Sequence, residues 1–559
     1  MSVDIIARGM IAAETAARKR LHVLHTLRAS MARTGLAMPD AGFGPNLVTN
    51  GTFDSDSAWT KGAGVTISGG MLNLTALSGF AEQAIPTVPG RTYVVTGLIT
   101  GGNQVFCGAW DNAGQSAALS STPRARGGAF QFHFTANDST AFLGFAGTGS
   151  GPATLDHITA REVLDSQLVL PTIGMNSANS TLSAATLWQV AADGKPLHAD
   201  KYTFVGAAWR VAGTSFPLNT VFKPITTRAG DGTNPLANET GSGRVRFALD
   251  APSLELYVRC DPLATNGGFR LKVDGRYVRL GALGIDAAAG AMRYIPVTWG
   301  DGSNTHRKTR HYELEFVQNA CFGGVRTGNA YRPSPCPQPD AIRVMIHGDN
   351  MVTSVIDSAS REGSPTAGCG FILADLLGQA DTWVSNVSGT GWFAPANPKT
   401  KNWFNDRVGL DVVPASPHAI VEMGGLNDSA IAGITPEAAQ AAVEAWLDTV
   451  ISARPETIVF MTGPMAPGAP SVGDMKIGAA KKAAAAKYPR NVAYIDNLTD
   501  PWFFGTGRQG NATGDGNRDW AIGSDTIHPT LEGHRYLAQR LARGIAAAIP
   551  VLIDRQGQT

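Results

Sequence analysis

The spacing of hydrophobic positions at the start of the chain predicts one long helix over residues 3–33. Because a lone amphipathic helix drifts off a heptad spacing, this pattern indicates a seam that packs against another surface. Arg20 stands where one further apolar residue would complete the series. Two interpretations stay open, a surface helix packed on its own chain and an oligomerising or docking helix, and the second is favoured. The seam alternates spacings of four and three through Ile6, Met10, Ala13, Ala17, Leu24, Leu27 and Met31.

Two β-rich regions follow this helix. Residues 45–163 contain short runs in which apolar and polar positions alternate between Gly, Asn and Pro turns, which predicts an all-β domain. Residues 165–335 repeat the pattern, and the turn Asp274–Gly275 after one run is a strong hairpin signal. The clearest runs are Val65–Ile67, Met71–Leu74, Tyr93–Thr96, Phe130–Phe134, Val245–Leu249, Leu254–Val258, Phe269–Val273 and His311–Phe316.

The pattern changes again at residue 341, where apolar strands begin to alternate with helices. Some strands are continuously apolar, as in a parallel sheet covered on both faces, so we expect a doubly wound, flavodoxin-like α/β domain. Helices are predicted near 366–379, 436–452, 474–487 and 531–547. The predicted strands are Arg343–His347, Thr382–Val387, Ala419–Met423, Thr457–Thr462 and Val492–Ile495.

Composition and charge narrow the function classes. At roughly 150 residues per domain, 559 residues predict three or four domains. With 46 basic and 45 acidic residues the net charge is +1, which excludes a global electrostatic grip on nucleic acid or an anionic membrane. The sequence contains no apolar run of about 20 residues that would insert into a membrane, and its N-terminus lacks a secretory signal pattern. Its five Cys are widely spaced and make no disulfide scaffold.

The first β-rich region resembles the jelly rolls of carbohydrate-binding modules. The second is similar to the β-sandwich that often precedes the catalytic domain of carbohydrate esterases. For Trp59 a role in the core is favoured over a platform for stacking on sugar, and sugar binding by this region stays open. The residues that carry the first resemblance are Asn46–Phe53, Trp59, Pro89–Tyr93 and Thr154–Thr159.

Four polar segments stand where the predicted strands of the α/β region end. They are His347–Asn350, Asn386–Gly391, Gly424–Asp428 and, before the last helix, Ser524–Pro529. Together and in this order they resemble the four blocks of the SGNH (GDSL-type) hydrolases. Each block alone is weak, but four blocks at strand ends that close with Asp-x-x-His are strong together.

The resemblance to SGNH hydrolases implies roles for individual residues. The catalytic base is His528, and Asp525, three positions earlier, orients its imidazole. The oxyanion donors are the Gly389 N–H, with Gly391 as its alternative, and the side-chain amide of Asn427. This pattern predicts transfer of an acyl group through an acyl-enzyme.

One position departs from the family. Residue 350 is Asn where SGNH hydrolases have their catalytic Ser, and a carboxamide is no usable nucleophile because its nitrogen lone pair is delocalised. The sequence therefore predicts an inactive esterase. Three explanations remain: an engineered knock-out, a natural pseudo-esterase that keeps a sugar-binding cleft, and an enzyme with another nucleophile, such as Ser354 or water activated by His528.

Other residues near these blocks receive simpler roles. His347 is expected to be a packed strand residue, and His534 a surface or hydrogen-bonded residue of the last helix. Asp349 is expected to cap its turn, and Asp428 to bond its own loop. No metal-ligand spacing or phosphate loop is present, so neither a metal nor a cofactor is predicted. The candidate sugar-stacking residues, on long loops at strand ends, are Trp392, Trp403 and Trp502.

The predicted order is an N-terminal docking helix and linker (1–42), a carbohydrate-binding-module-like β-sandwich (43–164), a second β-sandwich (165–338) and an SGNH-like domain (339–559). This order resembles bacteriophage tail fibres or tailspikes, which implies a virion tail protein that binds acetylated surface polysaccharide. It also implies a homo-oligomer, with a trimer favoured, and docking on other tail proteins through the helix. The alternatives are a non-enzymatic adhesin or structural virion component, located on the virion or on a bacterial surface, or secreted.

Overall fold

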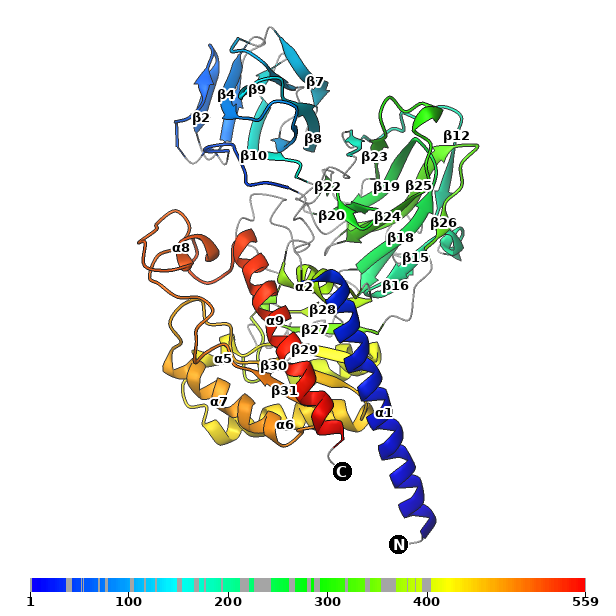
Figure 1. Cartoon of the computed structure of the whole chain (residues 1–559), viewed down its shortest axis with the longest axis vertical. Coiled ribbons are helices and arrows are strands. Elements are labelled where there is room, and N and C mark those ends of the chain that lie inside the picture. The colour runs from blue at the N-terminus through cyan, green and yellow to red at the C-terminus, as the bar shows by residue number, and fades with distance from the viewer. Residues whose placement is uncertain are drawn as a thin grey trace.

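The computed structural model covers three sheet-rich parts and a long N-terminal helix (Figure 1). The residues that it describes are 3–36, 43–51, 53, 55–68, 71–75, 79–100, 105–114, 117–125, 128–147, 153–164, 170–174, 177–192, 195–211, 221–225, 243–260, 267–278, 283–285, 292–316, 320–336, 342–352, 368–379, 381–387, 389–394 and 404–557.

The predicted N-terminal helix forms as α1 (Val3–Thr34). It runs beside α9 (Leu531–Gln556), and its first turns project past the body of the molecule (Figure 1). Arg20, at the gap in the apolar series, is buried and donates from Nε to Gln556 Oε1 at 2.6 Å. The later half of the seam therefore packs on its own chain. The α1 side chains buried in the core of the C-terminal domain are Val23, Leu24, Leu27 and Met31.

The first β-rich region forms antiparallel sheets around one core, which includes Trp59 at 7% exposure. Trp59 packs against Phe53 and Phe145, so its role in the core is confirmed. The strands are β1 (Thr60–Lys61), β2 (Val65–Ser68), β3 (Met71–Leu74), β4 (Phe80–Pro86), β5 (Thr92–Thr100), β6 (Val105–Trp110), β7 (Ala118–Ala125), β8 (Gly128–Thr135), β9 (Thr140–Gly147) and β10 (Ala153–Glu162).

The second β-rich region adds short and long strands and two 3-10 turns. They are β11 (Thr172–Ile173), β12 (Ala185–Gln189), β13 (Ala191–Ala192), β14 (Lys195–Pro196), η1 (Ala199–Lys201), β15 (Thr203–Val205), β16 (Ala208–Val211), β17 (Phe222–Ile225), β18 (Gly243–Leu249), β19 (Ser253–Cys260), β20 (Gly267–Val273), β21 (Arg276–Tyr277), β22 (Leu283–Ile285), β23 (Met292–Thr298), η2 (Asn304–His306), β24 (Arg310–Phe316), β25 (Ala320–Gly328) and β26 (Ser334–Pro335).

The two β-rich regions share a sheet, which the sequence pattern does not predict. The two-residue strand β11 pairs with β8 of the first region and with β23 of the second. Gln131 Nε2 also donates to the Val278 carbonyl at 2.7 Å in a buried contact between the regions. One sheet thus runs through both, with strand order β16-β17-β25-β19-β23-β11-β8-β5-β10-β3-β2.

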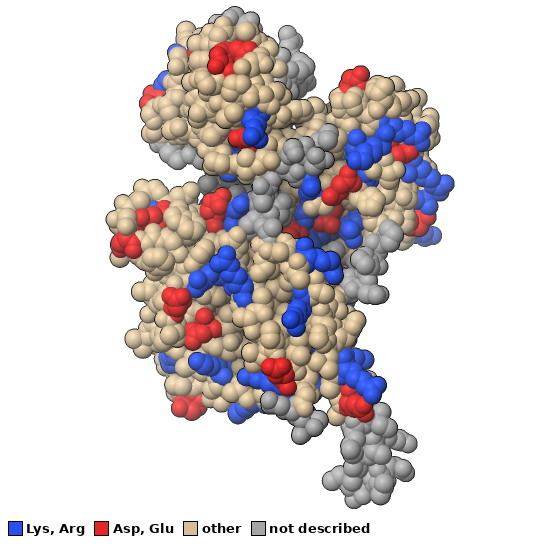
Figure 2. All heavy atoms as spheres, viewed as in Figure 1, with Lys and Arg blue, Asp and Glu red and all other residues tan. Residues whose placement is uncertain are grey.

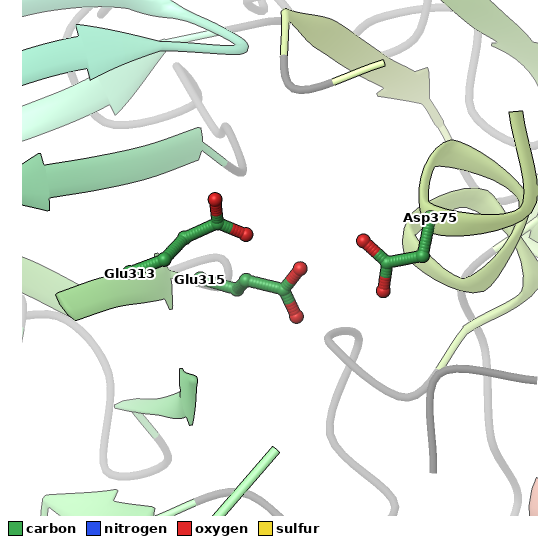
Figure 3. A group of neighbouring side chains, drawn as sticks. All are labelled: Glu313, Glu315 and Asp375. Carbon is green, nitrogen blue, oxygen red and sulfur yellow. The ribbon is translucent and has the colours of Figure 1, made fainter. Parts of the chain in front are cut away.

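A buried charge network joins the second β-rich region to helix α2 (Cys369–Leu377). Glu313 and Glu315 of β24 point toward Asp375 of α2 (Figure 3). Three such carboxylates can hold a cation, but here Lys272 Nζ bonds to all of them. Arg244 Nη2 adds ion pairs to Glu315 at 2.6 Å and to Asp375 at 2.9 Å. The protein's own cations therefore balance the carboxylates and fasten this region to α2.

The C-terminal domain contains a parallel sheet with strand order β28-β27-β29-β30-β31. This is the flavodoxin-like order that the sequence predicts. Each strand lies within a residue or two of its expected range. The strands are β27 (Val344–Gly348), β28 (Thr382–Asn386), β29 (Ala419–Met423), β30 (Ile458–Thr462) and β31 (Val492–Ile495).

The helices of this domain cover the sheet. By length and composition α9 is apolar enough to cross a membrane, but the face that carries Leu537, Leu541 and Ile545 lies in the core, as in a core helix of a globular domain. The helical elements besides α2 and α9 are η3 (Asn350–Val352), α3 (Phe404–Arg407), the π-helix η6 (Val408–Val412), α4 (Val413–Ala415), α5 (Leu426–Ser429), α6 (Pro436–Ala453), α7 (Val472–Ala486) and α8 (Arg518–Ala521).

Candidate active site

Three of the four predicted blocks meet at one edge of the parallel sheet. Gly348, the last residue of β27, is in register with Asn386 of β28 and Met423 of β29. The turns that follow these strands therefore begin side by side. Asn427 Nδ2 links them, because it donates to Asp349 Oδ2 at 3.3 Å and to the Thr390 carbonyl at 2.9 Å.

Position 350 lies in the first of these turns. Asn350 opens η3, and the side chain of Asp349 caps the turn by accepting the Met351 N–H at 3.0 Å. The capping role predicted for Asp349 is therefore confirmed. The side chain of Asn350 lies outside the described part of the structure, as do Ser354 and Trp403.

Asp525 and His528 form the expected pair. His528 Nδ1 lies 2.5 Å from Asp525 Oδ2, and Asp525 Oδ1 accepts the backbone N–H groups of Ile527 and His528. Thr526 bends the chain between them with φ of 74°. Burial alone would raise the pKa of Asp525, but these hydrogen bonds hold it below its ordinary value. An ionised Asp525 fixes the proton of the imidazole on Nδ1 and leaves Nε2 to accept one.

A chain of buried contacts connects this pair to the turn at position 350. Helix α9 begins just after His528, and His534 in its first turn accepts the Cys369 N–H with Nδ1 at 3.2 Å. The Cys369 thiol in turn bonds to the Val352 carbonyl at 3.4 Å. His534 is fully buried, so its predicted role as a hydrogen-bonded residue is confirmed.

The candidate oxyanion donors differ in the hydrogen bonds that their N–H groups already make. Gly391, the alternative, donates its N–H to the Ala394 carbonyl at 2.9 Å, so it can serve an oxyanion only after releasing this bond. Gly389, with φ of 73°, has no hydrogen-bond partner for its N–H among the described residues and stays the candidate. Both N–H bonds of Asn427 are already donated, to Asp349 and Thr390. Asn427 can serve an oxyanion only after releasing the longer bond, the one to Asp349.

Asp428 bonds a neighbouring loop and not its own, which corrects our expectation. Its carboxylate accepts the N–H groups of Trp392, Phe393 and Ala394 at 2.8, 2.7 and 2.9 Å. A Cβ on Gly391 would lie 2.5 Å from the same carboxylate, so this position requires glycine. Asp428 therefore fixes the loop after β28 against the turn after β29.

The aromatic predictions also need correction. Trp392 and Trp502 are only 3% and 5% exposed, so neither offers a face to a sugar. Trp392 packs on Phe404 within the core, where a large aromatic side chain gains most from burial. The exposed aromatic side chains of the later loop are Phe504 and Trp520, at 51% and 46%. Their sequence positions carry no signal that separates them from Trp502, because exposure depends on tertiary packing.

Phe504 and Trp520 lie on segments that the Arg518 side chain holds near His528. Arg518 bonds to the Gly505 carbonyl from Nη1 and to the Thr526 carbonyl from Nη2, both at 3.3 Å. The Trp520 carbonyl also accepts the hydroxyl of Thr530 at 2.7 Å, two residues after His528. An exposed apolar surface therefore borders the loop that carries Asp525 and His528.

Asp349 is a strongly shifted acid at this edge. Burial raises its pKa to about 7, and the nearby carboxylates Asp428 and Glu422 act in the same direction. Lys481, which forms a buried ion pair with Glu422 at 2.7 Å, opposes the shift. Asp349 thus changes charge in the neutral range, beside the Asn427 amide.

Residues 349–536 match the GDSL-like Lipase/Acylhydrolase family. The C-terminal part of the chain is a GDSL/SGNH-type acylhydrolase domain. It is similar to a GDSL lipase of Mycobacterium tuberculosis, at 27% identity over 207 residues, covering 36% of this chain and 79% of that protein.

The solved structures to which this chain is similar include carbohydrate esterases. A family 2 carbohydrate esterase of Corynascus thermopiles (Myceliophthora fergusii) with a carbohydrate-binding domain has a TM-score of 0.42 and 18% identity, covering 62% of this chain and 99% of that one. A family two carbohydrate esterase from Clostridium thermocellum, in complex with cellohexaose, has a TM-score of 0.43 and 14% identity, covering 62% and 100%.

The raised pKa of Asp349 predicts a pH-dependent stability. Its unfolded pKa is about 3.9, so the folded chain binds more protons than the unfolded chain between about pH 4 and 7 and loses stability as the pH rises through this range. The loss is at most about 1.4 kcal/mol per pH unit. Asp349→Asn removes the group that titrates and with it this loss of stability. The variant should therefore unfold at a higher urea concentration than the parent at pH 8 but not at pH 4.

Asp500→Asn is the matched control for this experiment, because the Asp500 side chain is 88% exposed. It should keep the pH profile of the parent. Urea unfolding followed by tryptophan fluorescence measures the stability at each pH. If the stability of Asp349→Asn and of the parent depended on pH in the same way, the raised pKa of Asp349 would be contradicted.

Proposed function

We propose that this chain binds O-acetylated polysaccharide through an SGNH-type carbohydrate esterase domain that does not hydrolyse its ligand while Asn occupies position 350. The observation that carries the proposal is the retained Asp525–His528 pair, with its contact of 2.5 Å, in a domain whose nucleophile position holds a carboxamide. The acid and base keep their geometry, and the group that they would activate is missing.

The reaction of the ancestral site follows from these positions. A serine Oγ at position 350 would attack the acetyl carbonyl while His528 Nε2 takes its proton. The tetrahedral oxyanion, held by Gly389 N–H and Asn427 Nδ2, collapses as the bond to the sugar oxygen breaks and His528 returns the proton to that oxygen. Water, deprotonated by His528, then hydrolyses the acetyl-enzyme to acetate.

Charge and exposed side chains support a polysaccharide ligand. Acidic and basic side chains are interspersed on the face of the C-terminal domain shown in Figure 2, consistent with the net charge of +1. A weakly charged partner is recognised by hydrogen bonds and by flat aromatic surfaces. Phe504 and Trp520 beside the catalytic loop supply such surfaces.

The second candidate function is a purely non-enzymatic adhesin or structural virion component with a degenerate esterase domain. The engagement of both Asn427 N–H bonds favours it, since this amide presents no free N–H to an oxyanion. Restoring the nucleophile separates the two candidates.

Asn350→Ser is expected to raise hydrolysis of p-nitrophenyl acetate at least about 100-fold above the parent, because nucleophile and base then act together. Asn350→Ala and the double variant Asn350→Ser/His528→Ala should stay at the level of the parent. A folded Asn350→Ser protein without activity would contradict the esterase proposal and support the adhesin.

Trp520→Ala is expected to weaken binding of acetylated xylan to the parent chain about tenfold, the loss of roughly 1.4 kcal/mol that one aromatic contact supplies. Affinity electrophoresis measures it. Leu197→Ala, which removes a side chain of similar exposure at 52% from the second β-rich region, should leave binding unchanged. Equal binding by both variants and the parent would place the ligand elsewhere.

We further propose a virion tail location, in which the projecting end of α1 joins copies of the chain into a homo-oligomer, with a trimer favoured, and docks on other tail proteins. The heptad seam supports this proposal, because its later half is used by the chain itself while its first turns project from the body (Figure 1). No role in binding nucleic acid or inserting into a membrane is proposed.

Deleting residues 1–15 is expected to convert the oligomer to a monomer, as measured by light scattering. Among the α1 side chains that the structure describes, Ala16 is the first that is buried. Leu24→Ala in the full chain is the control. It should lower stability by about 2–5 kcal/mol as a cavity variant but keep the oligomer. An unchanged mass after the deletion would contradict the proposal.

A further inference from the structure

A buried arginine lies behind the first two turns of the candidate site. Arg407, the last residue of α3, has a fully buried side chain. A buried charge of this kind is costly unless each of its polar groups finds a partner. Its partners therefore show what holds it in place.

The guanidinium of Arg407 bonds to both strand ends. Its Nη1 donates to the Gly348 carbonyl at 3.0 Å and to Thr390 Oγ1 at 3.3 Å, and its Nη2 donates to the Ser385 carbonyl at 3.0 Å. Gly348 immediately precedes Asp349 and the turn at position 350. Thr390 follows Gly389 and accepts the Asn427 amide with its carbonyl. One side chain thus spans the nucleophile turn and the oxyanion loop.

The counter-charge of Arg407 is also buried. Asp411 Oδ2 accepts Arg407 Nε at 3.3 Å and the Ser385 hydroxyl at 3.3 Å. Burial lowers the pKa of Arg407 and Asp411 opposes this effect. Asp411 belongs to the π-helix η6, which begins directly after Arg407, and such wide turns are frequent at functional sites.

A neutral histidine completes the surroundings of the guanidinium. His347 Nδ1 lies 3.5 Å from Arg407 Nη2. Burial holds the pKa of His347 well below its ordinary value, and the charges of Arg407 and Lys481 act in the same direction. His347 therefore adds no positive charge to the cluster. It is the packed strand residue that the sequence predicts.

We infer that Arg407 is a positioning residue of the acyl-transfer site, which fixes the turn at position 350 relative to the Gly389–Thr390 loop. A planar guanidinium reaches several oxygens at once, which a lysine ammonium on a flexible stem cannot reproduce. Nucleophile and oxyanion donor lie on the two segments that it joins, and a displacement of about 1 Å costs about 100-fold in rate. The catalytic part of the inference rests on the proposed function.

We call the contacts by which Arg407 joins the two segments the clamp. Hydrogen exchange in the parent chain tests the clamp without any need for activity. Arg407→Met should accelerate amide exchange at least about tenfold in both segments, 344–352 and 382–394, because each loses a buried bond. Arg20→Met is the matched control, since Arg20 is also buried but bonds to Gln556 and the Pro455 carbonyl, which belong to neither segment. Unchanged exchange in either segment would overturn the inference.

The kinetic test uses the Asn350→Ser background. Adding Arg407→Met should lower kcat for p-nitrophenyl acetate about 100-fold with little change in KM, Arg407→Lys should recover only part of kcat, and Arg20→Met should leave kcat unchanged. A full kcat in the Arg407→Met chain would overturn the positioning role. An inactive Asn350→Ser chain with the expected exchange would instead overturn the proposed function and leave the clamp standing.

Discussion

The in-register pairing of β27 with β28 and β29 is the constraint on which the candidate site depends. Parallel strands bring their carboxyl ends to one edge, and the backbone groups released there need partners. Side chains supply these partners across the turns: Asn427 joins the first turn to the second, and Asp428 joins the third to the second. Asn427, the proposed oxyanion donor, is therefore also one of the groups that hold this edge together.

Burial is the common physical cause behind the electrostatics of this edge. It raises the pKa values of Asp349, Glu422 and Asp428 and lowers that of His347. In contrast, Asp525 is part of an exposed loop and keeps a low pKa through hydrogen bonds. The domain thus separates an acid beside the histidine whose pKa is lowered from acids behind the turns whose pKa values are raised by burial.

The sequence predicts those elements and residues that follow a repeating pattern or a fixed spacing along the chain. Apolar strands such as Ala419–Met423 are predicted because they are short, mostly apolar runs between turns. The Asp525–His528 pair follows from the resemblance to SGNH hydrolases, whose Asp-x-x-His spacing is local in the sequence. The two-residue strand β11 has no period to detect, so the shared sheet was missed. Trp502 and Trp520 look alike in sequence, and only the packing of the loop decides that the second is exposed. The sequence likewise does not distinguish the buried Arg407 from an arginine on the surface.

The packing of α1 on α9 and α2 has a consequence for how the chain is made. Ser30 of α1 donates to the Leu377 carbonyl, and Arg20 reaches Gln556 near the last turn of α9. During synthesis α1 leaves the ribosome long before these partners exist, so its apolar stripe waits uncovered until the final helix emerges. Contacts between the two ends of a chain are slow to form because loop closure is costly. The C-terminal domain can therefore complete its core only once α9 has been synthesised, and a fragment that starts at its first strand would lack one wall of that core.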